Sequence, residues 1–511
     1  MESLLAISII VLGTLLNEIP LFVGIIRAKQ DMVFLGVISH AQDYFYYLSQ
    51  FAMGKNHWFF GFDPLTTEVR DLTLVGWPNV FLGKLFSIIG ISHFYAYQLS
   101  VALFTFFFLF LCYQLITKLV ATRLLRLFML FLFVFTNNLP LLSYDRGFHI
   151  SFRDFWFNLG NPLTRLGGVP HQLLANCAIL IIFLCTIRHY KQHSKSALAY
   201  LALAGFILAS INPVQWMVVG IVMAASFFQK RQAFLPAIVV IVSGLPIAIY
   251  LKELFAGLPY SQLVSWEAAQ HVSLGVIGLL STYGVTGIFA IIGLVLIAKN
   301  KNFEHRLVFL YGIISFALFY SPLPQLLHLT NARFISSVSV LALVYSAAIL
   351  VKTLVDRIHH EKIVYFMLST IVIVLFIPVF YLEVKDNTSY FQLNNAYYYL
   401  PKTVLSVFAK AQDISSENDA FLVMWPYDIS FAGLTGRREF NGHPLMTIDA
   451  KRKDDIAWQF FSGTLNQQSM QKMLYENHIT YVIAYPSTFP PSVYFLQTVY
   501  TNQALSLYRV K

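Results

Sequence analysis

Long apolar runs separated by short polar connectors dominate the first three quarters of the chain. Runs close to 20 residues long are typical of helices that cross a bilayer, and the 3.6-residue polar face of a soluble helix is missing from them. The pattern therefore predicts a polytopic α-helical membrane protein with about eleven transmembrane helices. The runs lie at 3–21, 93–117, 125–142, 171–187, 196–211, 214–228, 233–251, 272–298, 307–321, 334–351 and 363–382.

A different pattern begins near residue 385, where apolar and polar positions mix. FLVMW (421–425), ITYVIAYP (479–486) and ALSLYRV (504–510) predict strands, and NQQSMQKMLYENH (466–478) predicts an amphipathic helix. PSVYFLQTVY (491–500) predicts a second helix that begins at Pro491 or Ser492. We therefore expect a small α/β domain over 385–511 after a transmembrane domain over 1–384.

Composition supports the membrane assignment. Of the 511 residues 57% are hydrophobic and 12% are charged, whereas soluble proteins carry about 25% charged residues. The net charge of +10 does not require a nucleic-acid partner, because Lys and Arg concentrate in the cytoplasmic loops of membrane proteins. The N-terminal segment lacks a basic stretch and a small-residue cleavage site, so we expect a retained signal anchor.

The connectors alternate in character along the chain. Five short ones are basic, and they fall on one side if the runs alternate across the bilayer: 118–126, 188–195, 229–232, 299–306 and 352–362. The positive-inside rule makes that side the cytoplasm. The N-terminus is then cytoplasmic and the C-terminal domain extracytoplasmic. The longer connectors 22–92, 143–170, 252–271 and 322–333 lie on the outer face, where we expect the functional site.

The first outer loop, 22–92, contains HAQDYFYYLSQ (40–50), in which Asp43 stands among aromatic residues. The spacing of the aromatic residues predicts a helix lying in the membrane interface. Asp43 has two interpretations: it caps this helix, or it is a general base at the membrane surface. His40 could orient the acid, although a solvated loop histidine is the more common case.

Several stretches together resemble a known superfamily. EIPLFVGI, VFLGVISHAQDYFYYLSQFAMGKNHW, TTE and NVFLGKLFSIIGIS in the first outer loop, GGVPHQLLANCAIL (167–180), and LTGRREFNGHPLMT (434–447) are similar to GT-C polytopic membrane glycosyltransferases. The nearest resemblance is to a prokaryotic group with an RgtA/B/C/D-like membrane core. It implies an inverting transfer of a sugar from a polyprenyl-phosphate donor to a glycan, lipid or protein acceptor on the outer face, in glycan biosynthesis of the cell envelope.

The resemblance makes Asp43 the catalytic carboxylate of the first outer loop, acting as general base. The leaving phosphate needs cationic groups, and an Arg at the mouth of the tenth run, Arg333, has the position that lipid-phosphate-binding arginines take in this superfamily. For each arginine the alternative is a side chain that snorkels to the interface. The full set of predicted substrate-binding residues is Arg333, His171, Arg153, Arg165, Tyr44, Tyr47 and Glu68, with Arg146 as a further outer-face cation.

Asp145 and Asp154 share a loop with three of these cations. They could act as a second acid, hold a divalent cation, or pair with Arg146 and Arg153. Two carboxylates nine positions apart are a weak metal pattern, and the resemblance implies a reaction without metal, so we expect no metal and no other cofactor. His443 follows an Asn-Gly turn, and we expect it to be structural or to face the acceptor.

Other functions fit parts of the same pattern. A transporter or flippase would place ionisable groups at mid-membrane, whereas the acids here collect in outer loops. An O-antigen-type polymerase or ligase would share substrate and side, but would carry a large outer loop in its second half and no soluble tail domain. A non-enzymatic scaffold with a partner-binding tail predicts that Asp43 is dispensable.

Overall fold

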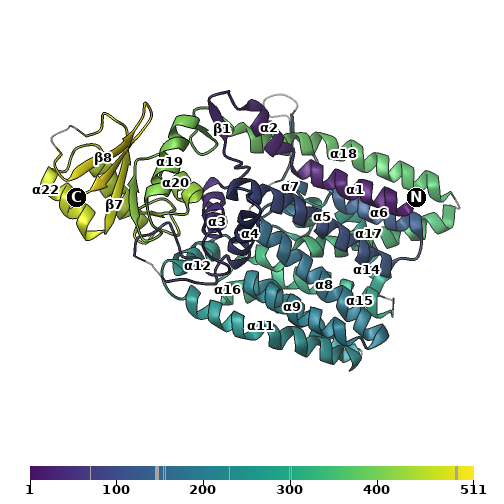
Figure 1. Cartoon of the computed structure of the whole chain (residues 1–511). Coiled ribbons are helices and arrows are strands. Elements are labelled where there is room, and N and C mark those ends of the chain that lie inside the picture. Colours follow the sequence, from purple (N-terminus) through teal and green to yellow (C-terminus); the bar gives the residue numbers. More distant parts are fainter. Residues whose placement is uncertain are drawn as a thin grey trace. The chain divides into compact units, whose positions relative to one another are not determined.

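The computed structural model describes the chain except for residues 69–70, 144–148, 154, 156, 230, 299, 301, 359 and 490–492. Two compact units make up the chain, and each is built from segments distant in sequence (Figure 1). Unit 1 comprises Met1–Ile19, Val101–Leu254 and Val264–Lys385, and unit 2 comprises Pro20–Ser100, Phe255–Leu263 and Asp386–Lys511.

Unit 1 is helical, and each apolar run of the sequence contains at least one helix. Short elements connect these helices: a hairpin of β2 (Leu141–Ser143) and β3 (His149–Ser151), α7 (Pro162–Leu166), and the 3-10 turn η2 (Asn331–Phe334). The helices on the runs are α1 (Glu2–Asn17), α5 (His93–Leu119), α6 (Arg123–Phe135), α8 (Pro170–Gln192), α9 (Lys195–Ile211), α10 (Pro213–Gln229), α11 (Phe234–Phe255), α13 (Val276–Ser281), α14 (Gly284–Ala298), α15 (Phe303–Tyr320), α17 (Ser337–Ile358) and α18 (Glu361–Ser389).

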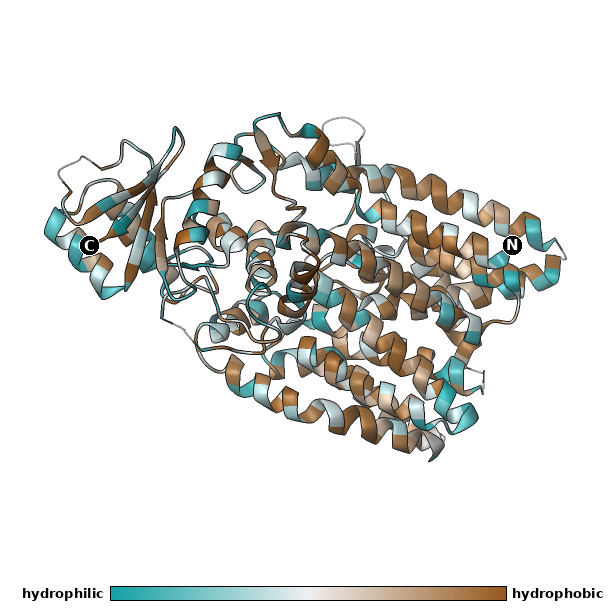
Figure 2. Ribbon diagram, in the orientation of Figure 1, coloured by the Kyte–Doolittle hydropathy of each residue, from teal (hydrophilic) through white to brown (hydrophobic). Residues whose placement is uncertain are grey.

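Helix length and exposure identify an integral membrane protein. Within the described residues, six helices are long and apolar enough to cross a bilayer: α5, α8, α11, α15, α17 and α18. A seventh crossing results if α1 and α2 (Ile19–Arg27), bent by 44° relative to each other, form one span. Only 22% of the apolar stretch of α18 is buried in protein, and the ribbon of this helix is largely brown in Figure 2. Its exposed apolar side chains therefore require lipid as solvent. The count of eleven crossings stays a prediction, because α9, α10 and α14 are shorter.

Unit 2 contains a five-stranded mixed sheet in the order β6-β5-β7-β9-β8. β5 (Ala420–Val423) runs parallel to β6 (Arg438–Glu439) and β7 (Ile479–Ala484), and β9 (Ser506–Val510) runs antiparallel to β7. α21 (Ala450–Phe461) and α22 (Gln467–Glu476) contribute to the apolar core on this sheet, together with Leu422, Val482 and Phe495. The strands β5, β7 and β9 and the helix α22 occur where the sequence predicts them.

One sequence prediction in this region is wrong. PSVYFLQTVY was expected to form a helix, but its second half is the strand β8 (Leu496–Thr501), which pairs antiparallel with β9. Thr, Val and Tyr in LQTVYT favour a strand, and the hydrogen bonds offered by the edge of β9 decide the outcome. The expected start of that helix, at Pro491 or Ser492, lies outside the described residues.

The first outer loop folds together with the C-terminal segment inside unit 2. β1 (Met32–Phe34) pairs antiparallel with β4 (Tyr399–Pro401), and the Tyr399 hydroxyl donates to Gly24 O at 2.9 Å. In space, the helices α19 (Lys402–Ile414) and α20 (Asp428–Thr435) lie between this pair of strands and the five-stranded sheet (Figure 1). Residues more than 360 positions apart therefore share one core. The predicted domain boundary at residue 384 stays a prediction.

The aromatic helix of the loop is α3 (Ala41–Met53), and it packs against α4 (Trp77–Ile88) and α20. Its aromatic residues Tyr44, Phe45, Tyr46 and Phe51 are buried within the protein. An interfacial helix would expose such a face to lipid, whereas here the residues pack against protein. Tyr97, for example, lies in edge-to-face contact with the rings of Tyr44 and Phe51.

Glycines allow α3 and α4 to approach closely. A Cβ atom added to Gly83 of α4 would lie 2.2 Å from Phe51 O and 2.8 Å from Phe51 Cα. These are backbone atoms, so neither can move without shifting α3. Gly54, directly after α3, meets the backbone of α4 in the same way.

We predict that Gly83→Ala lowers the stability of the protein by about 1–3 kcal/mol, because overpacking forces the two helices apart. Thermal unfolding in detergent would measure the change. Gly275→Ala is the matched control, since a Cβ atom there meets no heavy atom within 4 Å. Equal midpoints for the two variants would contradict the role assigned to this contact.

Candidate active site

Asp43 is the third residue of α3, and its side chain is 52% exposed. The helix begins at Ala41, after His40 in a left-handed conformation (φ 46°), so Asp43 lies within the first turn and not at the cap. A carboxylate there is favoured by the helix dipole. Asp43 Oδ1 lies 3.2 Å from His443 Nε2. No other described residue bonds the second carboxylate oxygen, Oδ2.

His443 comes from the C-terminal segment, 400 positions after Asp43, and is only 3% exposed. Its Nδ1 accepts from the backbone amides of Leu445 at 3.0 Å and Met446 at 3.3 Å. His40, which precedes Asp43 in the sequence, is exposed, and its side chain does not cap α3. The histidine that contacts the acid is therefore the distant one.

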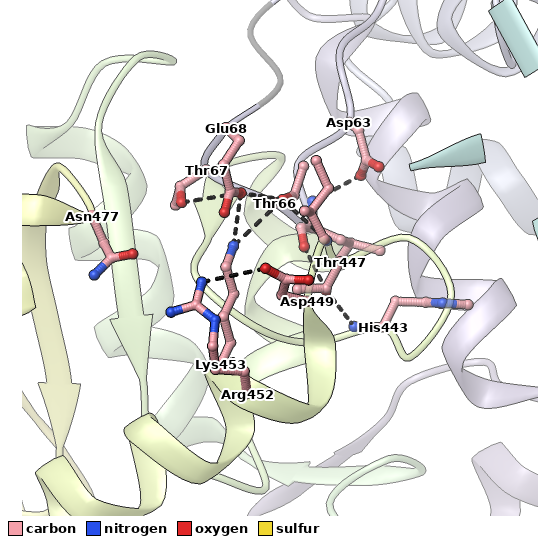
Figure 3. A network of polar contacts seen from close by, with 12 residues as sticks. Asp63, Thr66, Thr67, Glu68, His443, Thr447, Asp449, Arg452, Lys453 and Asn477 are labelled. Atoms are coloured by element: carbon pink, nitrogen blue, oxygen red, sulfur yellow. Dashed lines mark hydrogen bonds and ion pairs between the residues drawn. The ribbon is translucent and has the colours of Figure 1, made fainter. Parts of the chain in front are cut away.

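A network of polar contacts ties the loop segment 61–68 to the C-terminal segment beside His443 (Figure 3). Lys453 of α21 is fully buried and donates to Glu68 Oε2 at 2.7 Å. Burial raises the pKa of Glu68, but hydrogen bonds from Lys453 and Thr66 and the Lys453 charge outweigh it, so the pKa lies below its ordinary value. Thr447 Oγ1 donates to Leu65 O at 2.6 Å. Glu68, a predicted substrate-binding residue, is thus ionised and held by Lys453.

Asp63, in the same loop segment, is 1% exposed, and its Oδ1 accepts from the amide of Leu65 at 2.9 Å. Burial raises the pKa of Asp63 to about 7, although Arg438 and Lys453 oppose the change. The Arg438 guanidinium lies 4.3 Å from the ring centre of Phe62. Asp63 is therefore an acid that titrates near neutral pH within the core of unit 2.

The two predicted tyrosines differ in exposure. Tyr44 is buried; its hydroxyl donates to Leu35 O at 2.7 Å and accepts from Gln98 at 3.4 Å. Tyr47 is half-buried. The Tyr44 hydroxyl is engaged by protein atoms, so its contribution in the structure is to hold α3, while substrate binding by either tyrosine stays a prediction.

In unit 1, Arg333 lies in η2 and forms a two-pronged ion pair with Glu267, with Nε–Oε1 at 2.5 Å and Nη2–Oε2 at 3.2 Å. It borders a polar cavity with about 10 Å³ of free volume, room for roughly one water molecule.

Two further predicted residues are half-buried: His171, in the first turn of α8, and Arg153, near Gly278. Asp145, Arg146 and Asp154 lie outside the described residues, so their predicted roles stay predictions.

The prediction that Arg165 binds substrate requires a correction, because its side chain is not available to bind a phosphate. The side chain is 0% exposed, and all five of its N–H groups are directed at backbone carbonyls. Nε donates to Phe133 O, Nη1 to Leu159 O and Gly160 O, and Nη2 to Val134 O and Thr136 O, at 2.5–3.2 Å. Arg165 joins the ends of α6 and α7 as a structural residue. The sequence shows only an arginine near a span end, which suits either role.

Comparisons with solved structures show the fold. No family model and no curated protein matches the sequence. The archaeal oligosaccharyltransferase AglB from Archaeoglobus fulgidus, in complex with an inhibitory peptide and a dolichol-phosphate, is similar with a TM-score of 0.50 and 12% identity over 94% of this chain and 69% of that chain. An Archaeoglobus fulgidus oligosaccharyltransferase tethered with an acceptor peptide gives a TM-score of 0.53 at 13% identity, with the same coverage.

Arabinofuranosyltransferase AftD from Mycobacteria is also similar, with a TM-score of 0.53 and 12% identity over 100% of this chain and 41% of that chain. The similar structures are GT-C glycosyltransferases, as the sequence resemblance predicts. This chain thus has the fold of GT-C membrane glycosyltransferases, at identities that show the fold alone.

We predict that Asp63→Asn stabilises the protein more at pH 8 than at pH 5. Asp63 has a folded pKa near 7 and an unfolded pKa near 3.9. Its contribution is therefore complete below about pH 4 and is lost as the pH rises towards 7. The loss amounts to about 4 kcal/mol at most, and asparagine avoids it while still accepting from Leu65. Unfolding midpoints of both proteins at the two pH values test this; an equal difference at both would contradict the buried acid.

We predict that Arg165→Met destabilises the protein by about 3 kcal/mol or more, because several buried carbonyls lose their donors at once. Thermal unfolding in detergent micelles measures the loss. Arg188→Met, at an exposed position on α8, is the control. An Arg165 variant as stable as the control would restore Arg165 as a candidate ligand.

Proposed function

We propose that this protein is an inverting glycosyltransferase that moves a sugar from a polyprenyl-phosphate donor to an acceptor on the extracytoplasmic face, with Asp43 as general base. The observation that carries the proposal is the state of Asp43. Its carboxylate is half-exposed in the first helical turn of the loop, and His443 engages one of its two oxygens. The other oxygen has no hydrogen-bond partner among the described residues.

The chemistry follows from this geometry. The acceptor hydroxyl transfers its proton to Asp43 Oδ2, and its oxygen forms a bond to the anomeric carbon of the sugar. The bond from that carbon to the phosphate oxygen breaks, and the polyprenyl phosphate leaves as an anion. One displacement from the face opposite the leaving group inverts the anomeric centre. The reaction requires no redox partner, and the proposal includes no metal or other cofactor.

Similar structures support the class of donor and acceptor. AglB from Archaeoglobus fulgidus was solved with a dolichol-phosphate and an inhibitory peptide, and an oligosaccharyltransferase from the same organism was solved with an acceptor peptide. The exposed apolar helices of this chain are suited to a lipid environment. We infer that the donor is a lipid-linked sugar and the acceptor a glycan, lipid or protein. Arg333 stays the proposed phosphate ligand, since Glu267 fixes one edge of its planar fork. His171, Arg153, Glu68, Tyr44 and Tyr47 stay proposed substrate contacts.

The proposal also fixes a topology. We infer eleven crossings, a cytoplasmic N-terminus, and an extracytoplasmic location for the first outer loop and the α/β segment 385–511. The basic connectors support this orientation. Asp43 and the C-terminal segment that contacts it then lie on the same side of the membrane, as their shared unit requires.

We predict that Asp43→Asn lowers kcat by about 10²–10⁴-fold, because the variant cannot take the acceptor proton. Purified protein would be given tritiated hexose and pentose polyprenyl phosphates with membrane extracts as acceptors. Asp71→Asn, an exposed acid in the same loop, is the matched control and should keep full activity.

Three results would overturn the proposal in whole or in part. Full activity of Asp43→Asn would remove Asp43 from the reaction while leaving the enzyme class intact. No transfer by the wild type with any donor, together with movement of the lipid across vesicles, would favour a flippase. No activity of either kind would favour a scaffold with a partner-binding tail.

A further inference from the structure

We propose that His443 is the positioning residue for Asp43. It holds Asp43 Oδ1 through its Nε2–H group, so that Oδ2 is the oxygen presented to the acceptor. The inference rests on the proposed function, because it gives His443 a role in the same reaction. It also makes the C-terminal segment part of the active site and not an accessory domain.

Hydrogen bonding fixes the tautomer of His443. Its Nδ1 accepts from two backbone amides, those of Leu445 and Met446. An amide can donate only to an unprotonated nitrogen, so the ring proton is on Nε2. Nε2 therefore donates to Asp43 Oδ1 at 3.2 Å. The two amide contacts to Nδ1 also keep the ring in one direction.

The ring is also fixed in space. The His443 amide donates to Thr447 Oγ1 at 3.1 Å, and the Thr447 amide donates to His443 O at 2.9 Å. Thr447 Oγ1 in turn donates to Leu65 O of the first outer loop. The turn 443–447 is thus tied to the loop that carries Asp43 (Figure 3). Positioning groups of this kind hold a reactive side chain to within a fraction of an ångström.

The helices on both sides of the contact share one scaffold. A Cβ atom added to Gly433 of α20 would lie 2.7 Å from Phe45 Cδ1 and 3.0 Å from Phe45 O, so α20 lies directly on α3. Phe45 is two residues after Asp43, and the chain reaches His443 soon after α20 ends. The separation of Asp43 and His443 is therefore set by helix packing and not by a flexible loop.

A pair of the same type elsewhere in unit 2 provides a matched control. His57 Nε2 lies 2.9 Å from Glu417 Oε2, and Asn56 donates to Glu417 Oε1 at 2.6 Å. This pair also joins the first outer loop to the C-terminal segment, but neither side chain contacts Asp43. It should contribute to the stability of unit 2 without affecting the reaction.

The test uses His443→Asn and His443→Gln in the full-length protein. Asparagine places an oxygen where Nδ1 was, so it can still accept from the two amides, but it is too short to donate to Asp43. Glutamine can donate to Asp43 but cannot reproduce the turn. We expect His443→Asn to unfold near the wild-type midpoint and to lose about 10–100-fold in kcat, with the KM for the donor unchanged. His443→Gln should recover part of kcat, and His57→Asn should keep it.

Each outcome decides the proposal. A folded His443→Asn with wild-type kcat overturns it, as does an equal loss of kcat in His57→Asn, which would show that such pairs only hold the unit together. If His443→Asn does not fold, the glutamine variant decides: a folded His443→Gln with no more kcat than Asp43→Asn overturns the role. Full activity of Asp43→Asn would instead overturn the proposed function itself.

A spectroscopic measurement is independent of activity. In protein labelled with 15N-histidine, the resonances of the His443 ring, assigned by their loss in His443→Asn, should report the Nε2–H tautomer. A ring that carries its proton on Nδ1 and none on Nε2 would overturn the proposed hydrogen bond.

Discussion

The packing of α3 on α20 is the contact on which the candidate site depends. Gly433 allows α20 to touch the backbone of α3 at Phe45, and this close approach brings the chain near residue 443 to the first turn of α3. Without it, Asp43 would be an exposed acid with no defined direction. A reactive group needs such support, because small errors in orientation are costly in rate.

Unit 2 contains several buried ionisable groups near this contact. Lys453 is fully buried against Glu68, and Asp63 is buried in the loop between α3 and α4. Burial raises the pKa of Glu439, in β6, well above its ordinary value and that of Asp428, in α20, to about 7. Buried ionisable groups seldom add stability. Their concentration where the first loop meets the C-terminal segment indicates that this region gives up stability to fix one arrangement.

The two units differ in the side chains that they expose. The long helices of unit 1 expose apolar side chains. Backbone groups in lipid must form their hydrogen bonds within the protein, and Arg165 donates to backbone carbonyls at the ends of two elements. Unit 2 instead keeps Asp43 half-exposed beside a buried histidine.

The sequence by itself determined the membrane class, the positions of the apolar helices, and the strands β5, β7 and β9, because these depend on local composition and periodicity. Asp43 became a candidate through the resemblance of the first outer loop to GT-C glycosyltransferases. Only the tertiary structure decided which partners the side chains have. Arg165 and Arg333 look alike in sequence, yet Arg165 donates to backbone carbonyls, whereas Arg333 pairs with Glu267 through one edge of its guanidinium group. Likewise, residues 496–501 form the strand β8 because the edge of β9 provides hydrogen-bond partners. His443 is paired with Asp43 across 400 positions, and no local pattern carries that information, since helix packing sets the contact.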